Sequence, residues 1–235
     1  MDKWKAVYTE MCTYGLGASA QKPTAEIRQG AAYLAYELVT HPMTLEYHRK
    51  ELPWPAVLRE AIRLGYTSHQ TTTCGLHVHV NRDAFGASEM EQDAVIARIL
   101  YFFEKNWDEL LKFSRRTPRQ LEHWAARYGY KDQPKELLDH ATKGRHGGRY
   151  TNVNLTNADT IEFRIFRGTL KYNTLIATLQ LVDRVCDVAL YLTDDQLRAM
   201  SWTTFVAGCT QPELVQYLKE RRLYINEPVE SGEEI

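Results

Sequence analysis

Two short polar pairs in the sequence have side chains and a spacing that suit catalysis or ligand binding. His77 and His79 lie in the run Cys-Gly-Leu-His-Val-His-Val, and Glu162 and Arg164 lie in Thr-Ile-Glu-Phe-Arg-Ile-Phe. Residues two apart on a β-strand point to the same face. We therefore predict one strand with two imidazoles on one face and another with a carboxylate and a guanidinium, each with an apolar opposite face.

A third segment, residues 149–155, repeats this alternation. Tyr150, Asn152 and Asn154 alternate there with Thr151, Val153 and Leu155. We expect Asn152 to contact a bound cofactor, although an amide in a strand can equally satisfy a backbone group at a sheet edge. Three strands with such polar faces indicate a functional surface on the sheet, because a face that is merely solvated is usually rich in Lys, Glu, Thr and Ser.

The polar pairs predict a particular chemistry when they are taken together. Two imidazoles and the Glu162 carboxylate form a nitrogen and oxygen donor set that suits Mn²⁺, Zn²⁺ or partly hydrated Mg²⁺. A fixed Arg164 guanidinium beside the ion suits the oxygens of a phosphoryl group. Either pair alone also has a structural explanation, as surface histidines or a cross-strand ion pair. Their joint occurrence favours phosphate chemistry.

Composition narrows the class of protein. The chain has 235 residues, 44% of them hydrophobic, which is enough for one domain with a sizeable core. Its net charge of −1 gives no sign of nucleic acid or an anionic membrane as a partner. No apolar run approaches the roughly 18 residues of a membrane span, so we expect a cytoplasmic protein. The four cysteines form no Cys-x-x-Cys pair, and we expect free thiols.

Periodicity and capping signals predict the secondary structure. The first 32 residues are interrupted by glycines and read as irregular, and residues 226–235 read as a disordered acidic tail, which leaves 33–225 as the domain. Residues 143–149 form a basic glycine-rich loop that either faces phosphates or is merely exposed. Ser88 with Glu91 and Thr210 with Glu213 have the spacing of a capping box at the start of a helix. We expect strands at 34–39, 74–81, 149–155 and 160–166, and helices at 54–64, 88–111, 120–128, 135–142, 173–192 and 210–224.

At these residues the chain resembles a known superfamily. Gly75-Leu-His-Val-His is similar to the Gly-Met-His-x-His strand of glutamine synthetase, and Ile161-Glu-Phe-Arg is similar to its Ile-Glu-x-Arg strand. The same runs, together with Glu37-Leu-Val-Thr-His-Pro-Met, resemble the putative amidoligase family more closely. That family belongs to the superfamily of glutamine synthetase and γ-glutamylcysteine ligase. The resemblance covers about residues 33–225, with matching order and spacing.

The resemblance implies a fold, a reaction and residue roles. The fold is α+β, with a curved antiparallel sheet and helices on its outer face. ATP phosphorylates a carboxylate, and an amine then attacks the acyl phosphate to form an amide. His77 and Glu162 would bind a catalytic Mg²⁺ or Mn²⁺. His79, Arg149 and Arg164 would contact ATP phosphates, with Arg164 also catalytic. Glu37 would be a second metal ligand or an amine-site carboxylate with a catalytic role.

The sequence departs from the family at its beginning. The family opens with a Gly-x-Glu-x-Glu strand and an Asp-Gly-Ser segment, and neither is found in the chain. Glu10 is a poor substitute for the missing carboxylates. The expectation is therefore a fold without the family's first strand, through truncation, a misassigned start or loss of a metal site. Such a chain could bind nucleotide without turnover.

We thus expect an ATP-dependent ligase that joins a small-molecule or peptide carboxylate to an amine, with no nucleic-acid or membrane partner. A metal-dependent hydrolase is one alternative, because His-x-His also occurs where a metal activates water. A non-catalytic domain that binds nucleotide or a partner is the other. The sequence identifies neither the substrates nor the oligomeric state.

Overall fold

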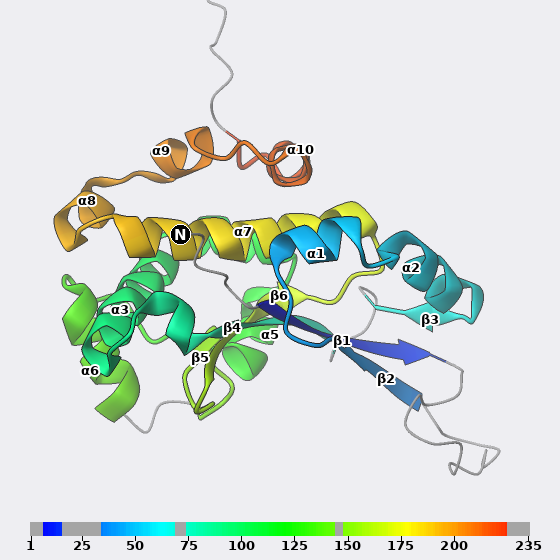
Figure 1. Cartoon of the computed structure of the whole chain (residues 1–235), viewed down its shortest axis with the longest axis horizontal. Helices are drawn as coiled ribbons and strands as arrows, with labels where there is room; N and C mark the ends of the chain where they lie inside the picture. Colours follow the sequence, from blue (N-terminus) through cyan, green and yellow to red (C-terminus); the bar gives the residue numbers. More distant parts are fainter. Residues whose placement is uncertain (1–6, 16–33, 69–73, 144–147, 225–235) are drawn as a thin grey trace, which may run out of the picture.

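The computed structural model describes residues 7–15, 34–68, 74–143 and 148–224. A small antiparallel sheet is combined with helices in this part of the chain (Figure 1). The strands are β1 Val7–Gly15, β2 Leu34–Val39, β3 Tyr66–Thr67, β4 Gly75–Asn81, β5 Val153–Asn154 and β6 Thr160–Arg167. The helices are α1 Leu45–Lys50, α2 Trp54–Arg63, α3 Glu89–Lys105, α4 Trp107–Ser114, α5 Pro118–Trp124, α6 Pro134–Lys143, α7 Tyr172–Tyr191, α8 Asp194–Ala199, α9 Trp202–Ala207 and α10 Pro212–Glu220, with a short 3₁₀ turn η1 at Arg82–Phe85.

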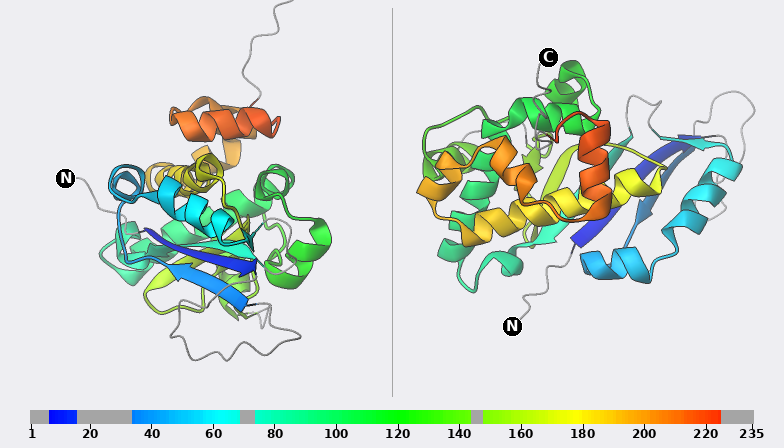
Figure 2. Two further views of the ribbon diagram at one scale, coloured as in Figure 1. Left: turned by 90° about the vertical axis from the view of Figure 1, so that its right-hand side faces the viewer. Right: turned by 90° about the horizontal axis from the view of Figure 1, so that it is seen from above.

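The sheet has the order β2-β1-β4-β6-β5, with β3 paired to β1. All of these pairings are antiparallel. In Figures 1 and 2 the long helix α7 crosses over the sheet, and α10 lies beyond α7 on the side away from the sheet. The α+β class is therefore confirmed. Curvature of the sheet and the absence of a family strand remain predictions.

The core lies between the apolar faces of the central strands and the helices. Leu76 and Val78 of β4 and Ile161 and Phe163 of β6 are fully buried. The Phe163 ring packs against Phe103 of α3, with ring centroids 5.4 Å apart. This arrangement confirms that the alternate residues of the two predicted strands face an apolar layer, and it fixes the direction of the polar faces.

Several helix boundaries follow from local capping. Ser88 and Glu91 form the predicted capping box at the start of α3. The long helix predicted for 88–111 divides at Asn106, whose backbone leaves the helical conformation (φ −106°, ψ 35°) and whose side-chain amide donates a hydrogen bond to the Phe102 carbonyl. Gly65 follows α2 with a φ of +83°, as expected of a glycine just after a helix.

Several parts of the predicted secondary structure are wrong or incomplete. Residues 7–15, expected to be irregular, form β1 in the middle of the sheet, between β2 and β4. Thr210 does not cap a helix, because α10 begins at Pro212 after Gln211, which makes no side-chain cap. The short helices α8 and α9 were not predicted, although Thr193 and Gln196 form a capping box at α8.

Other predictions lie partly outside the described residues. These are the remainder of the irregular N-terminal segment, most of the basic glycine-rich loop and the acidic tail, at 1–6, 16–33, 144–147 and 225–235. Cys74, Cys186 and Cys209 are buried thiols, as predicted. In the described part of the chain, no helix combines the length and the apolar character that crossing a membrane requires.

Candidate active site

The polar faces of β4 and β6 meet because of the register of the two strands. His79 lies opposite Glu162, and Val78 lies opposite Phe163. The next pair is Leu76 with Phe166, so two residues of β6 oppose one residue of β4 at this point. Such a β-bulge bends the strand and redirects its side chains. It explains why Ile165 and Phe166, which are adjacent in sequence, are both buried.

The Glu162 carboxylate is the centre of the polar cluster. Its Oε1 atom lies 3.2 Å from His77 Nδ1, 3.8 Å from His79 Nε2 and 2.5 Å from Arg164 Nη1. Its Oε2 atom accepts a hydrogen bond of 2.7 Å from Asn154 Nδ2. We call these five residues the Glu162 cluster. The structure thus brings His77, His79, Glu162 and Arg164 together, as the sequence predicted.

Burial makes these charged contacts stronger than they would be on the surface. Glu162 is 4% exposed, and Arg164 is 8% exposed. A carboxylate taken out of water is stable only when donors or positive charges compensate it; here Arg164 and Asn154 donate hydrogen bonds, and the nearest nitrogens of two imidazoles lie within 3.8 Å. The side chain of His79, at 20% exposure, is the most open of the ionisable members and also contacts Thr160 Oγ1 at 3.3 Å. Solvent and ligands therefore reach the cluster most directly at this imidazole.

An aromatic residue connects Arg164 with Arg149. The Arg164 guanidinium lies 5.6 Å from the centre of the Tyr150 ring, and the Arg149 guanidinium lies 5.2 Å from it. Trp124 packs edge-on against the same ring at 5.6 Å. Cations within about 6 Å of a ring centre are attracted to its electron-rich face. The Tyr150 ring thus places the exposed Arg149 next to the buried cluster. The sequence alone did not predict this contact.

A close approach at Gly75 explains the glycine that precedes the histidine pair. A methyl group added at Gly75 would lie 2.6 Å from His77 Nε2 and 2.7 Å from Arg116 Nη2. Both distances are well inside van der Waals contact, so the imidazole and the guanidinium occupy the space that a side chain would need. Gly75 therefore sets the position of the His77 ring.

Asn152, which we expected to contact a bound cofactor, is not part of the cluster. Its side chain is fully buried, and its amide nitrogen donates to Glu104 Oε1 of α3 at 3.2 Å. Glu104 also accepts hydrogen bonds from Arg127 and from the backbone of Tyr128. The Asn152 amide gives the buried Glu104 carboxylate a hydrogen-bond donor, and this bond connects the segment before β5 to α3. The regular alternation predicted for 149–155 fails because β5 has only two residues.

Two acidic residues can be placed only by backbone register. Glu37 of β2 pairs with Cys12 of β1, and β2 lies two strands from β4, which is about 10 Å. Its side chain lies outside the described residues, so its role at the cluster remains a prediction. Glu10 of β1 pairs directly with His77. We had set Glu10 aside as a single carboxylate in a glycine-rich context, and its pairing with β4 is not visible in a single sequence.

Metal binding remains a prediction, because the donor set is incomplete in the described residues. Imidazole and carboxylate groups are common ligands of divalent metals, and His77 and Glu162 provide one of each within 3.2 Å. Across the ranges that the structure describes, no group of three His, Cys, Asp or Glu residues has the geometry to hold an ion. Further ligands would have to come from other residues, from substrate oxygens or from water.

Sequence comparison establishes the family. The family described as "Putative amidoligase enzyme" matches residues 3–186, and the chain belongs to this family. The match begins in the segment before β1, so it includes the strand that we had placed outside the domain. No curated protein matches the chain.

A solved structure gives a weaker likeness. The chain is similar to a bifunctional glutathione synthetase from Pasteurella multocida, with 13% sequence identity and a TM-score of 0.49. The similarity covers 93% of this chain and 46% of that protein, so the chain spans less than half of its length. A likeness at this level carries no argument about activity.

Proposed function

We propose that the chain is an ATP-dependent ligase that joins a carboxylate to an amine through an acyl phosphate. One observation carries this proposal. His77, His79, Asn154 and Arg164 converge on the buried Glu162 carboxylate in a member of the amidoligase family. The substrates would be small molecules or peptides that carry the carboxylate and the amine.

The proposed reaction has two steps. An oxygen of the substrate carboxylate attacks the γ-phosphorus of ATP, the bond from this phosphorus to the bridging oxygen breaks, and ADP leaves. The nitrogen of the amine then attacks the acyl carbon, inorganic phosphate leaves, and the amine gives up a proton. Both steps develop negative charge on phosphate oxygens, so fixed cationic donors would lower both barriers.

Arg164 is suited to stabilise that charge. Glu162 holds its Nη1 atom at 2.5 Å, which fixes the plane of the guanidinium. Its Nε atom is buried and makes no hydrogen bond to the residues that the structure describes. A buried donor without an acceptor is costly, and a phosphate oxygen would satisfy it. Arg149, next to the same Tyr150 ring, and His79, the more exposed of the two imidazoles in the cluster, would provide further donors at the opening.

His77 and Glu162 are the residues that would hold a divalent metal, Mg²⁺ or Mn²⁺. When bound, the metal would offset the negative charge of the phosphates. The carboxylate already has Arg164 on Oε1, so it is fixed in place before any ligand arrives. Glu37 remains a candidate for a second metal ligand or for the catalytic amine-site carboxylate, by resemblance to the family alone.

Release of ADP tests the proposal. Purified protein would be incubated with ATP and Mg²⁺ or Mn²⁺, and with a panel of carboxylates and amines offered singly and in pairs. Ligation predicts ADP release that requires both co-substrates, together with one amide formed per ADP. Arg164→Lys keeps the charge but loses the planar fork, and we expect it to reduce turnover strongly. Arg198→Lys, at an exposed ion pair on α8, is the matched control.

The same assay distinguishes the alternatives. Metal-dependent cleavage of a substrate without ATP would favour a hydrolase. Tight binding of ATP without turnover for any substrate pair would favour a non-catalytic domain, in keeping with the lack of the Gly-x-Glu-x-Glu pattern in this sequence. Either result would overturn the ligase proposal.

A further inference from the structure

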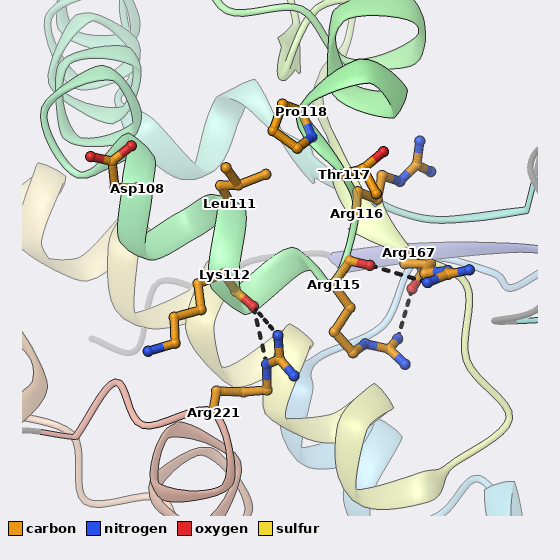
Figure 3. Close-up of a pocket in the computed structure, with 9 residues that line it drawn as sticks. All are labelled: Asp108, Leu111, Lys112, Arg115, Arg116, Thr117, Pro118, Arg167 and Arg221. Carbon is orange, nitrogen blue, oxygen red and sulfur yellow. Dashed lines mark hydrogen bonds between the residues drawn. The ribbon is translucent and has the colours of Figure 1, made fainter.

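A second group of cationic side chains lines a pocket at the end of β6 (Figure 3). The pocket has a volume of about 580 Å³. It lies where the end of α4, the segment before α5, the end of β6 and the end of α10 meet. We call it the arginine pocket after the charged residues that line it, which are Lys112, Arg115, Arg116, Arg167, Arg221 and a single carboxylate, Asp108.

Backbone carbonyls hold most of these guanidinium groups. Arg115 donates to the carbonyls of Arg167 and Gly168, and Arg167 donates back to the carbonyl of Arg115. Arg221 donates to the carbonyl of Lys112 through two nitrogens, as Figure 3 shows. Carbonyls fix the orientation of a guanidinium without cancelling its charge. These contacts therefore leave the positive charges of the pocket without neutralisation.

The ion pairs of the described residues support this interpretation. Lys112, Arg115, Arg167 and Arg221 make no ion pair with any carboxylate in the ranges that the structure describes. Burial, together with the neighbouring positive charges of Arg167 and Arg221, lowers the pKa of Arg115. A bound anion would relieve this repulsion.

We propose that the arginine pocket binds a small molecule that carries phosphate groups. The cationic side chains come from four separate parts of the fold and approach from different directions. A phosphate presents three terminal oxygens in a tetrahedral arrangement and can accept from several directions, whereas a carboxylate is planar and is matched by one guanidinium fork. The volume is within the range of small-molecule sites, about 300–1,000 Å³.

This pocket is separate from the Glu162 cluster. Arg167 pairs with Gly75 at one end of the two strands, and Glu162 pairs with His79 toward the other end. Arg167 lies five positions after Glu162 on β6, which corresponds to roughly 15 Å along a strand. A pyrophosphate is too short to contact both. The proposal therefore does not depend on the ligase activity.

Arg116 is the side chain that the two regions share. It lines the arginine pocket, donates to the Phe166 carbonyl at 3.1 Å, and lies with His77 against Gly75. A phosphate that binds in the pocket would contact a residue that packs beside an imidazole of the Glu162 cluster.

Calorimetric titration with inorganic pyrophosphate tests the proposal without ATP or metal. We expect saturable binding that weakens as salt is added. Arg167→Gln and Lys112→Gln should each weaken it about tenfold, as expected for the loss of one charge-assisted contact. Lys112 is exposed, and among the described residues its ammonium donates only to the Arg222 carbonyl, so its replacement should fold normally and carries the test if Arg167→Gln does not fold. Arg59→Gln, an exposed arginine of α2, is the control and should bind as the wild type does.

Two further titrations, one with citrate and one with a variant, distinguish the possible results. Citrate, a carboxylate polyanion, should bind more weakly than pyrophosphate, and equal binding would contradict the assignment to phosphate. His77→Ala should leave pyrophosphate affinity within about twofold. Loss of binding in His77→Ala but not in Lys112→Gln would place the anion at the Glu162 cluster and overturn the proposal. Absence of binding by the wild type would overturn it as well.

Discussion

Glu162 is the residue on which the geometry of the candidate site depends. It contacts two imidazoles, an amide and a guanidinium, and it is almost wholly buried. On the sequence alone, replacement of such a residue would be expected to affect binding more than folding. The structure changes this expectation, because removal of the carboxylate leaves the buried Arg164 charge without its partner.

We therefore predict that Glu162→Gln lowers the free energy of unfolding by about 3 kcal/mol, the scale for breaking a buried ion pair. Denaturant unfolding at neutral pH measures this value. Glu60→Gln removes a carboxylate from an exposed pair with Arg63 on α2 and should cause no measurable change. Equal stability of the two variants would show that Arg164 does not depend on Glu162.

Gly75→Ala should disturb the cluster without changing its chemistry. The added methyl group would displace the His77 imidazole, the Arg116 guanidinium or both, since each lies within 2.7 Å of its position. Overpacking of this kind costs about 1–3 kcal/mol. A lower melting temperature and weaker metal-dependent nucleotide binding are the expected results. An alanine variant with normal stability and binding would mean that the two side chains move away freely.

At the scale of the elements, the pairing of β4 with β6 assembles the site. The apolar face of each strand is buried, so each polar face must point the other way. For this reason the sequence alone could predict that His77 and His79 share a face. It could not predict the bulge beside Val78, because a bulge depends on which strand is the neighbour and in which register.

The helix caps provide a sharper test at this scale. Ser88 and Thr210 both precede a glutamate by three residues, and the sequence predicts a capping box at each. Only Ser88 forms one, with its hydroxyl accepting from the Glu91 backbone. We predict that Ser88→Ala lowers the free energy of unfolding by about 1 kcal/mol, whereas Thr210→Ala has no effect beyond a few tenths. Similar losses in chemical denaturation would mean that α10 begins earlier than Pro212.

At the scale of the whole molecule, a buried amide joins α10 to α7. Gln180 is fully buried in α7; its side-chain oxygen accepts from the Leu214 backbone at 2.8 Å, and its nitrogen donates to Glu213 at 2.7 Å. Glu213 is also paired with Arg49 of α1 at 3.4 Å. These contacts connect three helices, so their loss should weaken the attachment of α10 to the domain.

This connection should depend on pH. Burial alone would raise the pKa of Glu213, but the hydrogen bond from Gln180, its backbone hydrogen bond and the charge of Arg49 lower it from its ordinary value of 4.5. A carboxyl with a lowered folded-state pKa stabilises the fold above pH 4.5, and this contribution is lost as the pH falls further. Melting temperatures from pH 7 to pH 3 should therefore fall more in the wild type than in Glu213→Gln. Parallel curves would contradict this role.

The sequence predicted the local parts of the molecule better than the parts that depend on partners. The strand at 34–39 and the cap at Ser88 are confirmed, since each is decided by neighbouring residues. The β1 strand was missed because its place in the sheet comes from pairing with β4 and β2. Asn152 was assigned to the site because it shares a polar pattern with Asn154, but its partner Glu104 lies on α3, far away in the sequence.

Binding of ATP by the Arg164 variant tests the central claim most directly. Equilibrium affinity for ATP with Mn²⁺ would be measured for the wild type, for Arg164→Lys and for the control Arg198→Lys. We predict that Arg164→Lys binds about tenfold more weakly, because its ammonium cannot donate in the plane that Glu162 fixes, and that the control binds as the wild type does. Equal affinity in all three proteins would contradict the claim that the Glu162 cluster binds the phosphates of ATP.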